Sequence, residues 1–145
     1  MILFRRVKEN DLEFLYKLKK ESMGDYIEQV WGWNPKLQRE NIINRLKLKK
    51  DLIIIKSGKK IGYLSTFRTK KSITIVNLAI LPKYQNKGIG TKIFKKIVAI
   101  SIKKSKPLYF SVLKINVDAR NLWLRLGGNI IGEDDTHLFM KYVPK

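Results

Sequence analysis

The chain has 145 residues, enough for one domain with its own hydrophobic core, and its 44% hydrophobic content argues against disorder. The absence of cysteine excludes disulfides and a thiol nucleophile, and a single histidine excludes a multi-histidine metal site. The formal net charge is +19, and residues 36–125 hold 23 basic and three acidic residues. This excess favours a polyanionic ligand, although a generally lysine-rich surface would account for most of the lysines.

The first half of the chain predicts a strand followed by two helices. Residues 2–7 alternate weakly in hydrophobicity, as in a strand. Asn10 is the expected N-cap of a helix over about 11–22, which Gly24 is expected to end. Asn34 and Pro35 begin a second helix over about 35–49. The buried side of this second helix is expected to carry its apolar residues: Leu37, Ile42, Ile43 and Leu46.

Three strands and a long helix are expected next. Residues 51–56 and 60–68 are apolar runs joined at Ser57-Gly58, which is typical of a hairpin. Residues 73–81 form the next predicted strand. A helix over about 88–104 follows and must stop before Pro107.

The C-terminal part predicts a strand over 108–113, a short helix and two last strands. Asp118 is the expected N-cap of the short helix, and Gly127-Gly128 closes it. The last strands are 129–132 and 137–143.

The predicted order is therefore β-α-α-β-β-β-α-β-α-β-β, in a single domain over 1–145. We expect an α/β (α+β) fold with a mixed, mostly antiparallel sheet of six or seven strands and about four helices. The strands 73–81 and 107–113 flank a helix and should be parallel neighbours.

Two glycines mark the passage from the strand ending near Pro82 to the following helix. The connecting sequence contains Gln85-Asn86-Lys87-Gly88-Ile89-Gly90. The first turn of a helix has N–H groups without intrahelical partners and a partial positive charge. Glycines there remove side chains that would keep an anion away, and Lys87 and Lys92 add positive charge. This pattern predicts a phosphate or pyrophosphate site.

The same residues carry a resemblance to a known family. Gln85-x-x-Gly88-x-Gly90, after an apolar strand, resembles the acetyl-coenzyme A (acetyl-CoA) motif of the GCN5-related N-acetyltransferases, abbreviated GNAT. A second motif of that family is matched by Asn116-x-x-Ala119-x-x-Leu122-Trp123-x-x-Leu126-Gly127. The predicted element order is also similar to that of the family, so the resemblance covers nearly the whole chain.

The resemblance implies where acetyl-CoA would bind, and it implies no metal. Backbone N–H groups of the glycine loop would hold the pyrophosphate, the end of the strand before it would pair with the pantetheine arm, and two asparagines would contact the arm. The implied residues are Leu78, Ala79, Ile80, Gln85, Asn86, Lys87, Gly88, Ile89, Gly90, Thr91, Asn116 and Asn121.

The acceptor side is expected between the first two helices, because this connection lines the acceptor site in the family. Aromatic and acidic residues gather there, which suits a cationic or amphipathic amine. The expected acceptor residues are Tyr26, Glu28, Trp31 and Trp33.

The catalytic groups are less clearly marked. Glu28 is the first candidate for the general base, with Glu133, His137 and a water chain as alternatives. The family's usual tyrosine, which protonates the leaving thiolate, is replaced by Trp123. An indole N–H is not an acid of that kind, so either solvent or Tyr109 would take its place or the thiolate would leave without an acid.

The predicted function is transfer of an acetyl group from acetyl-CoA to a primary amine of a small molecule or peptide, by direct attack within a ternary complex. The alternative is a basic RNA- or ribosome-associated binding module in which acyl-CoA binding is vestigial. Neither an aromatic ribonucleoprotein motif nor zinc-finger spacing supports that alternative, so nucleic acid is the less favoured partner. The expected compartment is the cytoplasm, without a membrane anchor, and a homodimer is left open.

Overall fold

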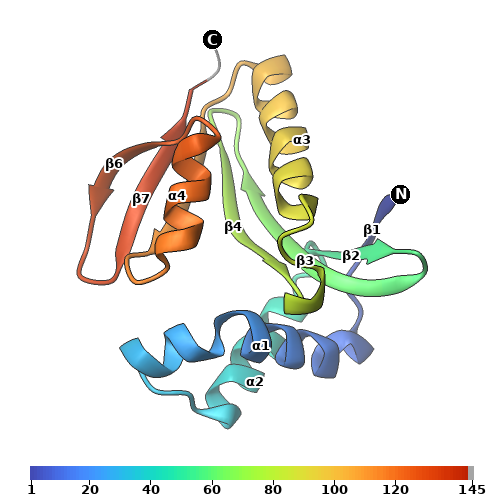
Figure 1. Ribbon diagram of the computed structural model, residues 1–145. Helices are drawn as coiled ribbons and strands as arrows, with labels where there is room; N and C mark the ends of the chain where they lie inside the picture. Colours follow the sequence, from blue (N-terminus) through green and yellow to red (C-terminus); the bar gives the residue numbers. More distant parts are fainter. Residues whose placement is uncertain (144–145) are drawn as a thin grey trace. The chain divides into compact units, whose positions relative to one another are not determined.

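The computed structural model describes residues 1–143 and divides the chain into two compact units. The first unit comprises residues 1–65 and 77–90, and the second comprises 66–76 and the residues from Thr91 onward. Figure 1 shows the elements along the chain. In chain order they are β1 (Ile2–Arg6), α1 (Leu12–Val30), α2 (Pro35–Leu46), β2 (Leu52–Lys56), β3 (Lys59–Arg68), β4 (Ile73–Ile80), α3 (Ile89–Lys104), β5 (Leu108–Leu113), α4 (Val117–Arg125), β6 (Asn129–Glu133) and β7 (His137–Tyr142).

The predicted fold class is confirmed. Within residues 1–143 there are seven strands and four α-helices, and the strands follow the sheet order β1-β2-β3-β4-β5-β7-β6. The pairing of β4 with β5 is parallel, as predicted, and joins Ile73 to Leu108 and Thr74 to Tyr109. The β1–β2, β2–β3, β5–β7 and β6–β7 pairings are antiparallel. The element order from sequence is therefore correct throughout.

The first unit contains the predicted hairpin of β2 and β3. Ser57 and Gly58 both adopt positive φ angles, 51° and 74°, and Lys56 pairs with Lys59 across the turn. Two central residues with positive φ are the signature of a turn whose twist matches that of the flanking strands. The Ser57-Gly58 signal in the sequence therefore placed this turn correctly.

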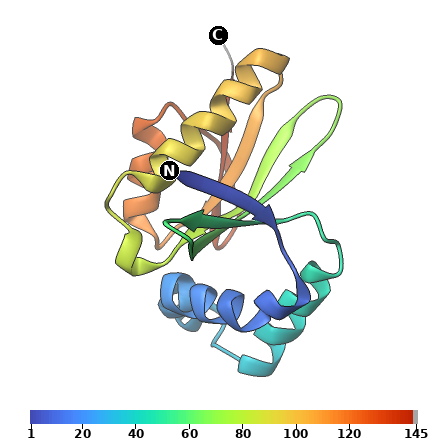
Figure 2. The same cartoon turned by 90° about the vertical axis from the view of Figure 1, so that its right-hand side faces the viewer.

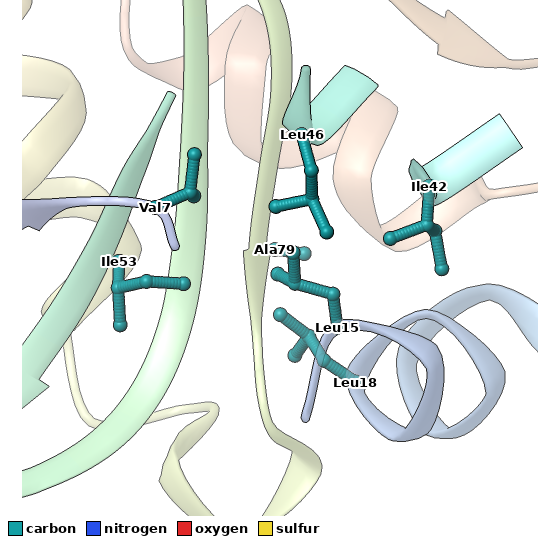
Figure 3. Packing of buried hydrophobic residues seen from close by; sticks show 7 residues of the cluster. All are labelled: Val7, Leu15, Leu18, Ile42, Leu46, Ile53 and Ala79. Atoms are coloured by element: carbon teal, nitrogen blue, oxygen red, sulfur yellow. The ribbon is translucent and has the colours of Figure 1, made fainter. Parts of the chain in front are cut away.

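The core of the first unit gathers around the inward faces of α1 and α2. Leu15 and Leu18 come from α1, and Ile42 and Leu46 come from α2. Figure 3 shows these side chains beside Ala79 of β4. Ala79 belongs to the strand end predicted to hold the cosubstrate, so the helix pair packs directly behind that strand end.

The first helix is longer than predicted. Residues 11–22 were expected, ending at Gly24, but α1 continues through Gly24 to Val30. A glycine inside a helix costs about 1 kcal/mol relative to alanine. Burial of Ile27, which is 7% exposed, outweighs that cost. The helix ends instead at Val30, and Gly32 closes it: the φ of Gly32 is +81° and its N–H donates to the carbonyl oxygens of Ile27 and Glu28.

The predicted N-caps are right for one helix and wrong for two. The Asn34 side chain accepts a hydrogen bond from the N–H of Leu37, as predicted for α2. Asn10 does not cap α1, because a short 3-10 helix over Glu9–Asp11 precedes it and Asp11 occupies the N-cap position. Asp118 does not cap α4, because Asn116 does so by accepting from the N–H of Ala119 at 3.2 Å.

The predicted second helix also needs correction. It ends at Leu46 rather than near residue 49. Ile42 and Leu46 are buried as expected, but Leu37 and Ile43 are 50% and 40% exposed. The inward position one turn before Ile42 is taken by Gln38, which is buried. The helical periodicity was right, but apolar type alone assigned the face incorrectly.

Two buried carboxylates brace the first unit. Asp11 is 0% exposed and accepts hydrogen bonds from both terminal nitrogens of Arg5, from Lys60 Nζ and from the N–H of Lys8. Burial alone would raise the pKa of Asp11, but these donors lower it well below its ordinary value. The residue therefore remains a carboxylate, and it ties β1 and β3 to the start of α1.

The second carboxylate, Asp51, precedes β2. It accepts from Arg45 Nε at 2.8 Å and from the Tyr63 hydroxyl, while Arg45 also donates to the Ser65 hydroxyl. Burial opposes ionisation of Asp51, but the hydrogen bonds from Arg45 and Tyr63 leave its pKa lowered. Burial and the bond to Asp51 raise the pKa of Tyr63, so it remains a neutral phenol. This network ties α2 to β2 and β3.

The second unit contains the β5–β7–β6 ladder together with α4 (Figure 1). Figure 2 shows α3, in yellow, from another side. An aromatic cluster joins three of its elements: Phe94 of α3 lies 5.4 Å from Phe110 of β5 and 4.9 Å from Trp123 of α4, measured between ring centroids. Gly128 permits this packing, because an added Cβ would lie 2.8 Å from the Phe110 ring. The predicted closure of α4 at Gly127-Gly128 is confirmed, with the Gly128 N–H donating to the Trp123 carbonyl.

Candidate functional site

The glycine loop leaves β4 through a single 3-10 turn over Pro82–Tyr84. The Leu81 N–H donates to the Ile61 carbonyl at 2.8 Å, which fixes the start of the loop on β3. The Gln85 side-chain Nε2 donates to the Ile80 carbonyl at 2.9 Å, which folds the loop back on the strand it leaves. The Gln85 side chain therefore helps to hold the loop, while its backbone N–H belongs to the segment predicted to contact the cosubstrate.

The middle of the loop turns through two left-handed residues. Asn86 and Gly88 have φ angles of +60° and +78°. Helix α3 starts immediately afterwards at Ile89, which is buried and anchors the turn. Left-handed residues directly before a helix N-terminus are typical of anion-binding loops.

The space around the two motif glycines is open. A Cβ built on Gly88 or on Gly90 meets no atom within 4 Å. The glycines are therefore not required by close packing of the protein against itself. Gly88 is explained by its positive φ, whereas Gly90 has an ordinary φ and no such constraint. Open space above the first turn of α3 is what an incoming phosphate group requires, so these residues fit a bound pyrophosphate.

Two lysines lie beside Tyr84 in this loop. The ammonium groups of Lys83 and Lys87 lie 5.8 and 5.9 Å from the centre of the Tyr84 ring. Both distances are near the upper limit for a cation–π interaction. The contacts nevertheless place two positive charges beside the loop. This placement favours an anionic ligand.

The end of β4, before the loop, lies very close to its neighbouring strand β3. A Cβ on Gly62 would lie 2.5 Å from the carbonyl oxygen of Ala79 and 2.9 Å from Ile80 Cδ1. Only glycine allows β3 to approach Ala79 this closely. Gly62 was not singled out from the sequence, although a lone glycine inside a strand is the signal that could have found it.

The remaining predicted cosubstrate residues lie in the second unit. Thr91 continues the first turn of α3 and is half-buried. Asn116 is half-buried and uses its Oδ1 to cap α4, so its side-chain NH₂ is the part suited to donate to a ligand. Asn121 is exposed on α4.

Trp123, at the family's tyrosine position, belongs to the aromatic cluster of the second unit. Its ring contacts Phe94 and lies 5.9 Å from the Phe110 ring. The indole therefore has a packing role in this unit.

The connection between α1 and α2 is held by aromatic and charged contacts. The Trp33 indole N–H donates to the Tyr16 hydroxyl at 3.2 Å, and the two rings are 5.7 Å apart. The Arg39 guanidinium lies 3.9 Å from the centre of the Tyr16 ring and is paired with Glu13. The Tyr16 ring therefore already makes a cation–π contact with Arg39 of the same chain.

The four predicted acceptor residues are not all in a loop. Tyr26 and Glu28 lie on the last turns of α1, because the helix passes Gly24. The Glu28 carboxylate accepts from the backbone N–H of Trp33, so it braces the connection while remaining exposed. Trp31 is 59% exposed at the helix end, and Trp33 is half-buried against Tyr16. Sequence reasoning missed Tyr16 and Arg39, for which spacing along the helices gave no signal.

Comparison with known proteins identifies the family. The sequence model of the Acetyltransferase (GNAT) family matches residues 12–128. The chain belongs to this family, and at this level the resemblance and the predicted class of enzyme, an N-acetyltransferase, are confirmed. The match extends over both compact units. Whether residues 1–145 act as a single domain stays a prediction.

One curated relative and two solved structures are similar to this chain. The thialysine N-epsilon-acetyltransferase of Mus musculus is 29% identical over 75 residues, which cover 51% of this chain and 44% of the mouse protein. The PaiA N-acetyltransferase of Thermoplasma acidophilum, solved in complex with coenzyme A, superposes with a TM-score of 0.76 at 18% identity, covering 99% of each chain.

A third relative is the ribosomal-protein-S18-alanine N-acetyltransferase of Escherichia coli. It superposes with a TM-score of 0.70 at 19% identity, covering 100% of this chain and 96% of that one. At these identities the two structural likenesses establish the fold. Among residues 1–143, no helix has the length and apolar character needed to span a membrane.

Proposed function

We propose that this protein transfers an acetyl group from acetyl-CoA to a primary amine, with the amine attacking the thioester carbonyl directly in a ternary complex. The observation that carries the proposal is the loop into α3, where two left-handed residues precede a helix start with open space above Gly90. Membership of the GNAT family, and the coenzyme A complex of the Thermoplasma acidophilum relative, support the same ligand.

The donor side would be held mostly by backbone groups. N–H groups from Gln85 to Thr91 would bind the pyrophosphate at the positive end of α3. The strand end Leu78–Ile80, backed by Gly62, would offer its N–H and carbonyl groups to the amides of pantetheine. Asn116 and Asn121 would contribute further polar contacts. An N–H near Leu78 or Ile80 would stabilise the developing oxyanion of the thioester.

The acceptor would be an amine on a small molecule or a peptide. The mouse relative is named for a side-chain amine, and the E. coli relative for a protein alanine. Both are primary amines, which agrees with the predicted chemistry and leaves both kinds of acceptor to be tested. We place the acceptor at the α1–α2 connection, among Tyr26, Glu28, Trp31 and Trp33.

Glu28 would take the proton from the amine, and solvent would supply the proton to the thiolate. Glu28 remains the proposed base, because its carboxylate is exposed at the connection, although it also accepts from the Trp33 N–H. Trp123 has no acidic proton to give, so the leaving thiolate would be protonated by solvent. Catalysis would then depend mainly on positioning and on the oxyanion contact.

Gly90 offers a clean test of the donor site. Gly90→Asp places a carboxylate where the pyrophosphate would bind, without backbone strain or a clash, and aspartate is favourable in the first turn of a helix. We expect the variant to fold normally while its Kd for acetyl-CoA rises at least tenfold, or about 1.4 kcal/mol. Gly90→Asn is the matched control, since it has the same shape without the charge. Isothermal titration with acetyl-CoA and with CoA measures both.

Two results would contradict the proposal. If wild-type protein shows neither calorimetric binding nor a thermal shift with millimolar acetyl-CoA, the donor site does not exist. If Gly90→Asp and Gly90→Asn both bind acetyl-CoA with the same Kd as the wild-type protein, the phosphates are held elsewhere. RNA binding that falls steeply with salt, in protein that ignores acetyl-CoA, would favour the basic binding module instead.

A further inference from the structure

Gln38 is a buried polar residue with an unmet hydrogen-bonding group. Its side chain is 7% exposed, and Oε1 is fully covered. In the part of the chain that the structure describes, no group donates a hydrogen bond to this oxygen. Buried side-chain oxygens without a donor are rare in folded proteins, and each one requires an explanation.

The sequence around Gln38 makes the burial more unusual. The inward face of α2 continues from Gln38 to Ile42 and Leu46, both buried and apolar. The neighbouring Leu37 is half exposed on the outside of the same turn. An exchange of these two residue types would remove the unmet oxygen and bury a leucine. A local pattern that conflicts with packing in this way is expected at functional positions.

Gln38 lies at the end of α2 that adjoins the α1–α2 connection. Its backbone N–H donates to the carbonyl of Asn34, the N-cap residue of the helix. The next residue, Arg39, covers the Tyr16 ring, and Tyr16 accepts from the Trp33 indole. The unmet oxygen therefore belongs to the same end of the helix pair as the proposed acceptor residues.

The unmet hydrogen-bonding group at this end indicates the kind of ligand. Gln38 Oε1 is an acceptor only, and the exposed carboxylate of Glu28 is an acceptor as well. The oxygen of Gln38 requires a hydrogen-bond donor, which a carboxylate or phosphate anion does not supply. An ammonium or amine carries N–H donors, and it is the reactive group of the proposed acceptor.

We propose that Gln38 binds the acceptor substrate, with Oε1 accepting a hydrogen bond from an N–H of the amine. The inference rests on the proposed function. Because Oε1 is covered in this structure, binding would require the Gln38 side chain to rotate about its χ angles until Oε1 reaches the substrate N–H. The unmet oxygen is then the resting form of a binding group, and a leucine or methionine at this position would fold better and bind the amine less well.

Gln38→Met tests this inference, since methionine keeps the shape of the side chain and removes the amide. The probes are thialysine and a short peptide with an N-terminal alanine, each assayed by release of CoA thiol. We expect the KM for the amine to rise about tenfold, the KM for acetyl-CoA to stay unchanged, and the melting temperature to stay equal or rise. Gln29→Met is the matched control, because Gln29 is an exposed glutamine on α1.

Several outcomes would overturn the inference. A raised melting temperature with an unchanged amine KM would mean that a buried water satisfies Oε1. Equal increases in both KM values would mean a general loss of structure. Wild-type protein that neither acetylates nor is thermally stabilised by either probe would also overturn it. Absence of acetyl-CoA binding is measured separately and would refute the proposed function rather than the role of Gln38.

Discussion

Gly62 gives the sharpest structural prediction, because the same substitution at another glycine should have the opposite effect. In Gly62→Ala, the new Cβ would lie 2.5 Å from the Ala79 carbonyl oxygen, whereas ordinary contacts begin at 3.4 Å. The obstacle is backbone, which cannot rotate away as a side chain can. In Gly24→Ala, the new Cβ would meet only the Lys20 side chain, at an ordinary 3.5 Å.

The two expected magnitudes follow from these contacts. Overpacking costs about 1–3 kcal/mol, and a clash with backbone belongs at the upper end of that range. Alanine also lowers the conformational entropy of the unfolded chain, which stabilises the folded state by about 0.4–1 kcal/mol. The net effect of Gly62→Ala should therefore be a loss of about 2 kcal/mol in the free energy of unfolding. That corresponds to a fall of roughly 5 °C in melting temperature. Gly24→Ala should stabilise by about 0.5–1 kcal/mol, because alanine is the better residue inside a helix.

Urea unfolding of the three proteins, followed by circular dichroism, measures both changes. Acetyl-CoA titration adds a functional measurement, because a displaced Ala79 should also weaken binding of the pantetheine arm. If Gly62→Ala unfolds within about 0.5 kcal/mol of wild type, β3 does not approach Ala79 as described, and the account of the strand end is wrong.

Two further predictions concern a buried charge and the aromatic cluster. Asp11 has a folded-state pKa below its unfolded value near 3.9, so its stabilisation is present above about pH 4–5 and is lost as pH falls. Asp11→Asn should lose about 2 kcal/mol at pH 7 and respond less to acid, as urea midpoints from pH 2 to 7 would show; parallel pH curves would contradict this. Trp123→Tyr should lose about 1–2 kcal/mol of packing against Phe94 and Phe110. Its kcat should rise about tenfold if a missing acid limits thiolate release, and an unchanged kcat in stopped-flow thiol assays would remove that idea.

The order of elements was predictable because it depends on local patterns. The Ser57-Gly58 turn, the Asn34 cap and the Gly127-Gly128 closure each rest on a few adjacent residues, whose backbone preferences are intrinsic. The glycine loop could also be singled out in this way, since a strand, two glycines and a helix start together predict a phosphate site.

Other features were decided by contacts between residues distant in the sequence. Helix α1 continues past Gly24 to Val30 because Ile27 gains burial that outweighs the cost of a glycine inside the helix. Arg39 reached Tyr16, and Glu28 braced Trp33, through the packing of α1 on α2. The residues predicted to form an acceptor loop therefore lie partly on the last turns of α1, where the Glu28–Trp33 hydrogen bond holds the helix end.

The amino-acid sequence by itself determined the family and the order of elements, and it predicted the phosphate loop, because all three depend on short-range motifs. Only the tertiary structure decided that Gly62 must lack a Cβ against Ala79 and that Gln38 is buried with an unmet oxygen. Both facts depend on how closely separate elements approach, and side-chain periodicity carries no information about that distance.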